Sequence, residues 1–126
     1  MFGVELLQNR VRDIKDAVMF DIDDTLISVS GKPLELMIDL LKEALDLEYF
    51  VIVMTARPIS QDNVQWTIEQ MKSLDIPYTQ LFFVPAEFKG DAKIKSGYNY
   101  VLSVGDMPTD LTETEHWINT SDGTYA

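Results

Sequence analysis

The most informative segment of the chain reads Val18-Met19-Phe20-Asp21-Ile22-Asp23-Asp24-Thr25-Leu26. Its apolar beginning is typical of a buried strand, and alternation along a strand places Asp21 and Asp23 on one side with Ile22 facing the core. Two carboxylates this close repel each other unless a cation lies between them. Carboxylate and carbonyl oxygens are ligands that Mg²⁺ prefers. The segment therefore predicts a metal-assisted reaction on an oxyanion, with phosphate as the favoured class.

Composition limits the classes of protein to which this chain can belong. The chain has 126 residues, of which 46% are hydrophobic and 25% charged, typical of one soluble globular domain. It contains no cysteine, so thiolate chemistry and disulfides are excluded. A formal net charge of −11 argues against broad nucleic-acid binding. No apolar run approaches membrane-spanning length and the first residues lack the apolar core of a secretory signal, so we expect a cytoplasmic protein without membrane contact.

Hydrophobic periodicity predicts alternating helices and strands. Helices are expected at residues 2–15, at 34–47, from Ser60 to Leu74, and briefly within 85–97. Strands are expected at 17–20, 49–54, 81–84 and 100–104, followed by a helical turn around 111–117 and a polar terminus. Such alternation indicates a mainly parallel sheet with right-handed crossovers. The predicted fold class is therefore α/β, a three-layer Rossmann-like domain that occupies residues 1–126.

Polar side chains follow four of the predicted strands, at or shortly after the point where each strand ends. They are Asp21 and Asp23, then Thr55, then Lys89 or Lys93, and finally Asp106 with Asp110. The carboxyl ends of parallel strands share one edge of the sheet, which is where open α/β sheets bind ligands. We therefore expect these residues, although distant in sequence, to converge on one site.

The order of these clusters resembles the haloacid-dehalogenase superfamily of phosphohydrolases. Asp21-Ile22-Asp23-Asp24-Thr25 is similar to the first family motif, Thr55 to the second, a lysine within 89–95 to the third, and Gly105-Asp106-Met107-Pro108-Thr109-Asp110 to the fourth. The resemblance spans residues 17–111. Within it, Phe88-Lys89 and Gly97-Tyr98 are similar to the acid-phosphatase and polynucleotide-phosphatase branches.

This resemblance implies a phosphatase mechanism. Asp21 would attack phosphorus to form an aspartyl-phosphate, and Asp23 would act as the general acid and base. Thr55 would hydrogen-bond a phosphoryl oxygen, and Lys89 would neutralise negative charge. The implied Mg²⁺ ligands are Asp21, Asp23 through its carbonyl, Asp106 and Asp110. A direct bond from Asp110 is less favoured than one from Asp106, because Asp110 can instead cap the next helix.

Some positions admit two interpretations. Lys89, Lys93 and Lys95 lie close together; Lys89 is favoured as the catalytic lysine by its expected place in a loop, and any of the three can be plain surface charge. Thr55 taken alone is expected to satisfy the backbone at a strand end. For Arg57, contact with substrate and a solvent-facing position are equally open.

The spacing of the motifs leaves no room for a large cap domain over the site. Within the resemblance this implies an open site for a phosphorylated macromolecule or a nucleotide end, while a small phosphomonoester acted on by an oligomer stays open. Two other functions are to be weighed: a phosphate-accepting signalling module, and a catalytically idle interaction domain of the same fold. The late Gly105-Asp106 fits the signalling module poorly.

Overall fold

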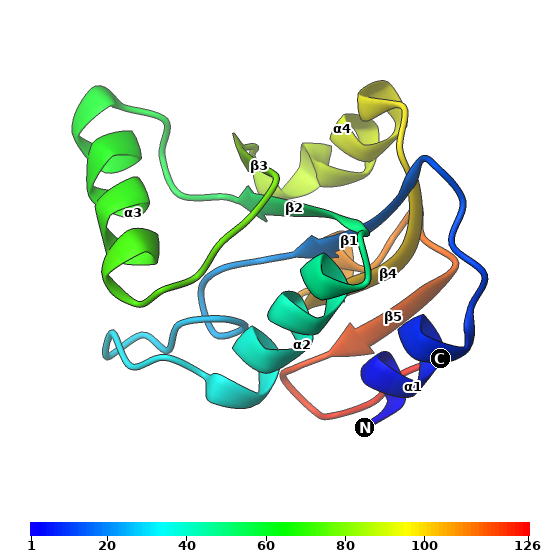
Figure 1. Cartoon of the computed structure of the whole chain (residues 1–126). Coiled ribbons are helices and arrows are strands. Elements are labelled where there is room, and N and C mark those ends of the chain that lie inside the picture. The colour runs from blue at the N-terminus through cyan, green and yellow to red at the C-terminus, as the bar shows by residue number, and fades with distance from the viewer.

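Five parallel strands form one sheet in the order β3-β2-β1-β4-β5 (Figure 1). The computed structural model describes residues 1–126. The strands are β1 (Asp16–Phe20), β2 (Phe50–Thr55), β3 (Gln80–Phe83), β4 (Asn99–Gly105) and β5 (His116–Asn119). The helices are α1 (Phe2–Asn9), α2 (Glu35–Asp46), α3 (Gln61–Ser73) and α4 (Lys89–Ser96), with short 3₁₀ turns η1 (Ala86–Phe88) and η2 (Pro108–Asp110). The predicted α/β, Rossmann-like fold is confirmed.

The sheet separates two apolar clusters. Side chains from β1, β2 and β4 pack on one face with α1, α2 and Met71 of α3. On the other face, Met19 and Met54 pack with Ala92 of α4. Central β1 is buried along its whole length because it has strand neighbours on both edges and helices over both faces. The apolar run that precedes Asp21 therefore becomes the middle of the sheet.

The predicted N-terminal helix is shorter than expected. It ends at Asn9, whereas the prediction extended it to residue 15. Val11 and Ile14, which supplied the helical spacing, are 89% and 81% exposed, so this spacing did not reflect burial. The backbone N–H of Asp16 bonds to Asp13 in a turn that leads into β1, and this turn is incompatible with a continuous helix.

The C-terminal region also differs from the prediction. Residues 116–119 form strand β5 beside β4, where we expected a helical turn around 111–117. The polar terminus pairs with β5 in turn, since Trp117 and Ala126 exchange two backbone hydrogen bonds of 3.1 Å. Both features depend on pairing with distant chain, which a local pattern does not encode. No helix has the length and hydrophobicity needed to span a bilayer.

Candidate metal centre in an acidic pocket

Three carboxylates meet at the carboxyl ends of β1 and β4. Asp21 is the first residue after β1, and Asp106 is the first residue after β4. Asp110 is the last residue of the η2 turn that follows β4. One carboxylate oxygen from each lies within 4.8 Å of the others. Asp21 and Asp110 are buried, and Asp106 is half-buried. The fold thus places three oxygen donors, of the kind that hard divalent cations prefer, around one point.

Lys89 supplies the counter-charge within this cluster. Its ammonium nitrogen donates to Asp21 Oδ1 at 2.9 Å and to Asp110 Oδ1 at 2.6 Å. The side chain is only 2% exposed, so these two carboxylates replace its water shell. We predicted that Lys89 lies in a loop; it is instead the first residue of α4, and its side chain reaches back across the site.

Burial and mutual charge together shift the pKa values of this pair. Burial raises the pKa of the Asp21 carboxyl to about 7; the Lys89 ammonium opposes this, and the Asp110 carboxylate adds to it. Burial acts to lower the pKa of Lys89, but the charges of Asp21 and Asp110 outweigh it and raise that pKa. The lysine therefore stays charged, whereas Asp21 is protonated readily unless further positive charge is present.

Lys93 has a structural role beneath the carboxylates. Its ammonium donates to Ser103 Oγ at 2.9 Å and to the backbone carbonyls of Asp110 and Thr112 at 2.7 and 2.6 Å. Burial lowers its pKa to about 8. Lys93 therefore fixes the backbone that carries Asp110 and does not contact the carboxylates themselves. Exposed Lys95 contacts none of the three acids, so the geometry places Lys89 alone among the three lysines at the site.

Gly105 allows Asp110 to approach the sheet. A Cβ at position 105 would collide with the Cβ of Asp110, so a side chain there forces a shift. The Asp110 carboxylate also accepts a 3.2 Å bond from the backbone N–H of Met107, which closes the η2 turn. Asp110 therefore caps the turn that it ends; the helix that we expected it to cap is absent, because strand β5 is the next element.

Asp23 does not belong to the cluster of three acids. The strand ends at Phe20, so strand alternation does not extend through Asp23 as predicted. Its carboxylate is 51% exposed and accepts two bonds from Arg57, from Nε at 3.0 Å and from a terminal nitrogen at 2.8 Å. Asp21 and Asp23 nevertheless line the same pocket.

Arg57, whose role the sequence left open, links the loop after β1 to α3. Besides Asp23, it donates to Thr67 Oγ1 at 3.1 Å and Gln70 Oε1 at 2.9 Å, both on α3. Its backbone N–H bonds to Thr55 Oγ1 at 3.2 Å. Thr55 is buried and holds this loop, the strand-end role that its sequence alone favoured. Its place two residues after the end of β2 is the only sequence signal that marks Arg57.

The acidic pocket has a volume of 400 Å³. Asp21, Asp23, Arg57, Lys89 and Asp106 contribute to its lining. Thr109 also lines it, and its buried hydroxyl oxygen has no hydrogen-bond partner. A buried hydroxyl without a partner is costly, so this oxygen needs a hydrogen-bond partner that the protein itself does not supply. Sequence reasoning did not single out Thr109, because a threonine in a turn carries no distinctive signal.

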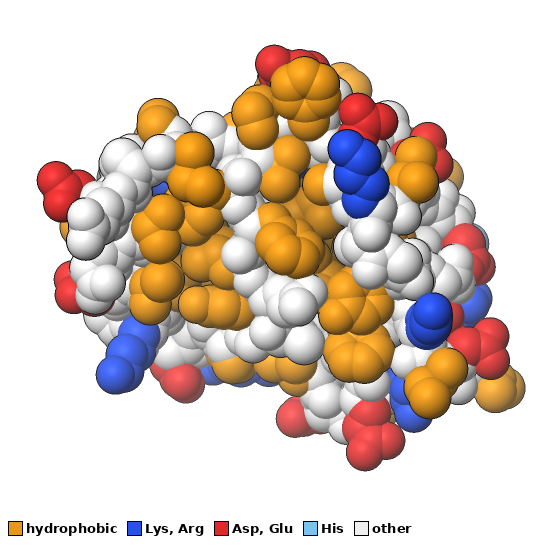
Figure 2. Space-filling model, turned by 90° about the horizontal axis from the view of Figure 1, so that it is seen from above, with side chains coloured by type: hydrophobic (Ala, Val, Ile, Leu, Met, Phe, Trp, Pro, Cys, Tyr) orange, Lys and Arg blue, Asp and Glu red, His pale blue; other side chains and the backbone are white.

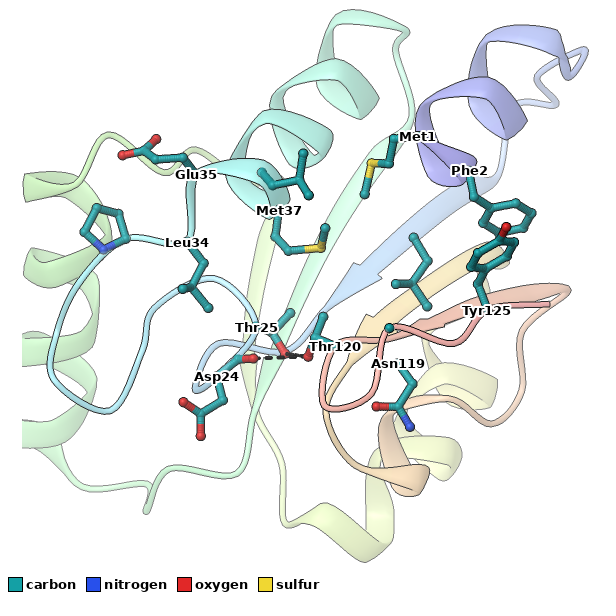
Figure 3. A pocket seen from close by; sticks show the side chains of 14 residues that line it. Met1, Phe2, Asp24, Thr25, Leu34, Glu35, Met37, Asn119, Thr120 and Tyr125 are labelled. Atoms are coloured by element: carbon teal, nitrogen blue, oxygen red, sulfur yellow. Dashed lines mark hydrogen bonds between the residues drawn. The ribbon is translucent and has the colours of Figure 1, made fainter.

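A second, more apolar cavity of 720 Å³ lies beside the acidic pocket, and Asp24 lines both. Its walls include Leu34, Met37 and Phe2, while Thr25 and Thr120 lie together at its base, joined by a 3.3 Å hydrogen bond (Figure 3). Leu34 and Met37 come from the segment after the acidic loop, and Phe2 from α1. The chain thus offers an apolar surface next to its charged site.

Comparison with known proteins gives no family assignment: neither a protein-family model nor a curated protein sequence matches this chain. The observations therefore define a small α/β domain with a five-stranded, all-parallel sheet and a buried acidic cluster able to hold a metal ion.

Proposed function

We propose that this protein is a Mg²⁺-dependent phosphomonoester hydrolase of the haloacid-dehalogenase type that acts through an aspartyl-phosphate. The observation that carries this proposal is the convergence of Asp21, Asp106 and Asp110 around Lys89 at the carboxyl edge of the sheet. The order of the motifs that supply these residues, and the fold, are consistent with that superfamily.

The donor set fits Mg²⁺. All three clustered side chains offer carboxylate oxygens, and no nitrogen or sulfur ligand accompanies them. Asp21, Asp106 and Asp110 would hold the ion, with the Asp23 carbonyl as the further ligand implied by the resemblance. When bound, Mg²⁺ supplies positive charge at phosphoryl oxygens. It also favours the ionised form of Asp21, whose pKa burial otherwise raises to about 7.

The first step is attack by an Asp21 carboxylate oxygen on phosphorus. The new O–P bond forms as the bond to the leaving alkoxide breaks, and Asp23 gives its proton to that alkoxide. Water then attacks the phosphorus of the aspartyl-phosphate, Asp23 takes the water proton, and inorganic phosphate leaves Asp21. Lys89 holds Asp21 in place and reduces the negative charge that meets the phosphate.

Arg57 and Thr109 would complete the phosphate site. Arg57 holds both oxygens of Asp23, so this pair must open, with Arg57 turning to the phosphate, before Asp23 can carry the proton. The unpaired Thr109 hydroxyl would donate to a phosphoryl oxygen. Between β1 and β2 the chain contains one loop and α2, and the acidic pocket is open to solvent. We therefore propose a substrate that carries its phosphate at the end of a larger molecule.

Hydrolysis of p-nitrophenyl phosphate tests the activity. We expect turnover with Mg²⁺, loss of turnover in EDTA, and loss in Asp21→Asn. The matched control is Asp39→Asn, an exposed carboxylate on α2 outside the pocket, which should keep full activity. Lack of turnover with every divalent metal, or unchanged activity in Asp21→Asn, would contradict the proposal.

Acid quenching during turnover tests the intermediate and separates the two alternatives. A hydrolase should show the mass of one phosphoryl group on Asp21 that disappears once substrate is exhausted. Persistence of that group for minutes to hours would instead favour a signalling module. No phosphorylation at all, together with tight binding of a macromolecule, would favour an idle interaction domain.

A further inference from the structure

The two edges of the sheet are covered differently. Along β5, the C-terminal segment pairs antiparallel, with Ile118 opposite Tyr125, and satisfies the outer backbone groups. At the opposite edge, β3 pairs only with β2. The outer edge of β3 therefore presents N–H and C=O groups without strand partners, which form a template for another strand. The chain thus covers the β5 edge with its own C-terminal segment and leaves the β3 edge without a strand neighbour.

This open edge lies along a trough. A cavity of 890 Å³ is lined by the whole of residues 78–84, which contain β3. Val64 and Ile68 of α3 and Ala92 and Lys95 of α4 also line it. Figure 2 shows hydrophobic side chains gathered around a hollow beside α3. The trough is thus mainly apolar, with a strand edge between two helices.

Alternate residues of β3 face opposite layers. Leu81 packs against the cluster that contains α2, whereas Phe82 packs against the cluster that contains Ala92 of α4. The two helical walls therefore lie over opposite faces of the strand, and the cavity follows its outer edge. A segment in this trough would extend the sheet and place its alternate side chains against α3 and α4.

We propose that an extended peptide segment of a partner protein binds in this trough as a sixth strand beside β3. The β3 backbone supplies hydrogen bonds, and the walls receive apolar side chains at every second position. Lys95 is the only charged residue in the lining, and its ammonium has no carboxylate within 4.0 Å. The peptide is therefore expected to carry an Asp or Glu opposite Lys95.

A second copy of this chain fits the trough less well. The net charge of −11 on each copy opposes the close approach of two copies. A short peptide with a single acidic residue carries far less charge, so this repulsion is much weaker for it.

The probe is a set of peptides of about six residues, the usual length of a strand, that alternate Val and Thr with one Glu moved through the sequence. Titration followed by amide NMR should show a member that binds with a Kd below about 1 mM, shifts the amides of 80–83 and slows their exchange. The control peptide has the same side chains but N-methyl groups along one edge, and should bind at least ~10-fold more weakly because it lacks the donors. If no peptide binds, or if the methylated peptide binds equally well, the proposal is wrong.

Variants locate the binding. Ile68→Ser in the trough should weaken binding roughly fivefold or more, whereas Ile14→Ser, at a more exposed isoleucine outside it, should not. Lys95→Gln should weaken the Glu peptide and leave its Gln counterpart unchanged. Concentration-dependent dimerisation that protects β3 without peptide would identify a second copy and overturn the proposal. Asp21→Asn should bind peptide normally, so this result is independent of the proposed hydrolase activity.

Discussion

Replacing Lys89 with methionine removes the ammonium ion that two carboxylates share. The lysine is 2% exposed and lies 2.9 and 2.6 Å from Asp21 and Asp110. Methionine keeps a flexible apolar stem of similar length, so the main effect is the loss of charge. Leaving buried charge uncompensated costs about 3–5 kcal/mol, which for a domain of this size lowers Tm by roughly 10–20 °C. We therefore expect Lys89→Met to be strongly destabilised at pH 8 without divalent cations.

Two conditions should reduce this loss of stability in Lys89→Met. At pH 5 the carboxyl of Asp21 is protonated, because burial raises its pKa to about 7, so less charge is left uncompensated. Saturating Mg²⁺ replaces the missing positive charge. Urea unfolding at pH 5 and 8, with and without Mg²⁺, measures both. The control Lys95→Met removes an exposed lysine without a partner and should change stability by less than about 0.5 kcal/mol. If Lys89→Met matches the control at pH 8, the reasoning is refuted. In Mg²⁺ its kcat should still fall about 10²–10³-fold.

Four further predictions concern pH, metal and packing. Because burial raises the pKa of Asp21 from 3.8 to about 7, the metal-free protein should lose stability as pH rises from 4 to 7, and Asp21→Asn should flatten this slope while Asp39→Asn should not. At pH 8, Mg²⁺ at about 100 times its Kd should stabilise the wild type by about 2.7 kcal/mol, seen as a higher Tm, and leave the Tm of Asp21→Asn unchanged. Burial lowers the pKa of Lys93 from 10.5 to about 8, so the unfolded state binds more protons in that interval and stability should rise from pH 8 to 10.5; a flat urea-unfolding profile would contradict this. Gly105→Ala should cost about 1–3 kcal/mol and weaken Mg²⁺ binding in calorimetry, since its Cβ would displace Asp110.

Local sequence was sufficient where burial and periodicity agree. The apolar runs at 17–20, 49–54 and 100–104 became the three central strands, because each is buried by neighbours on both edges. The same reasoning failed at the periphery, where pairing decides the outcome. Residues 116–119 form a strand only because β4 lies beside them. Val11 and Ile14 have helical spacing but no surface to cover, so the helix ends before them.

The sequence alone determined that acidic and cationic groups follow the ends of parallel strands. These groups lie at one edge of the sheet because the carboxyl ends of parallel strands all lie there. Only the tertiary structure decided which groups meet there. It turned Asp23 toward Arg57 and brought Asp110 beside Lys89. It also assigned Lys93 to the backbone carbonyls below. These assignments depend on where the helices pack and on the close approach of Asp110 to Gly105. Both result from contacts between segments that are far apart in the chain, so no local sequence pattern predicts them.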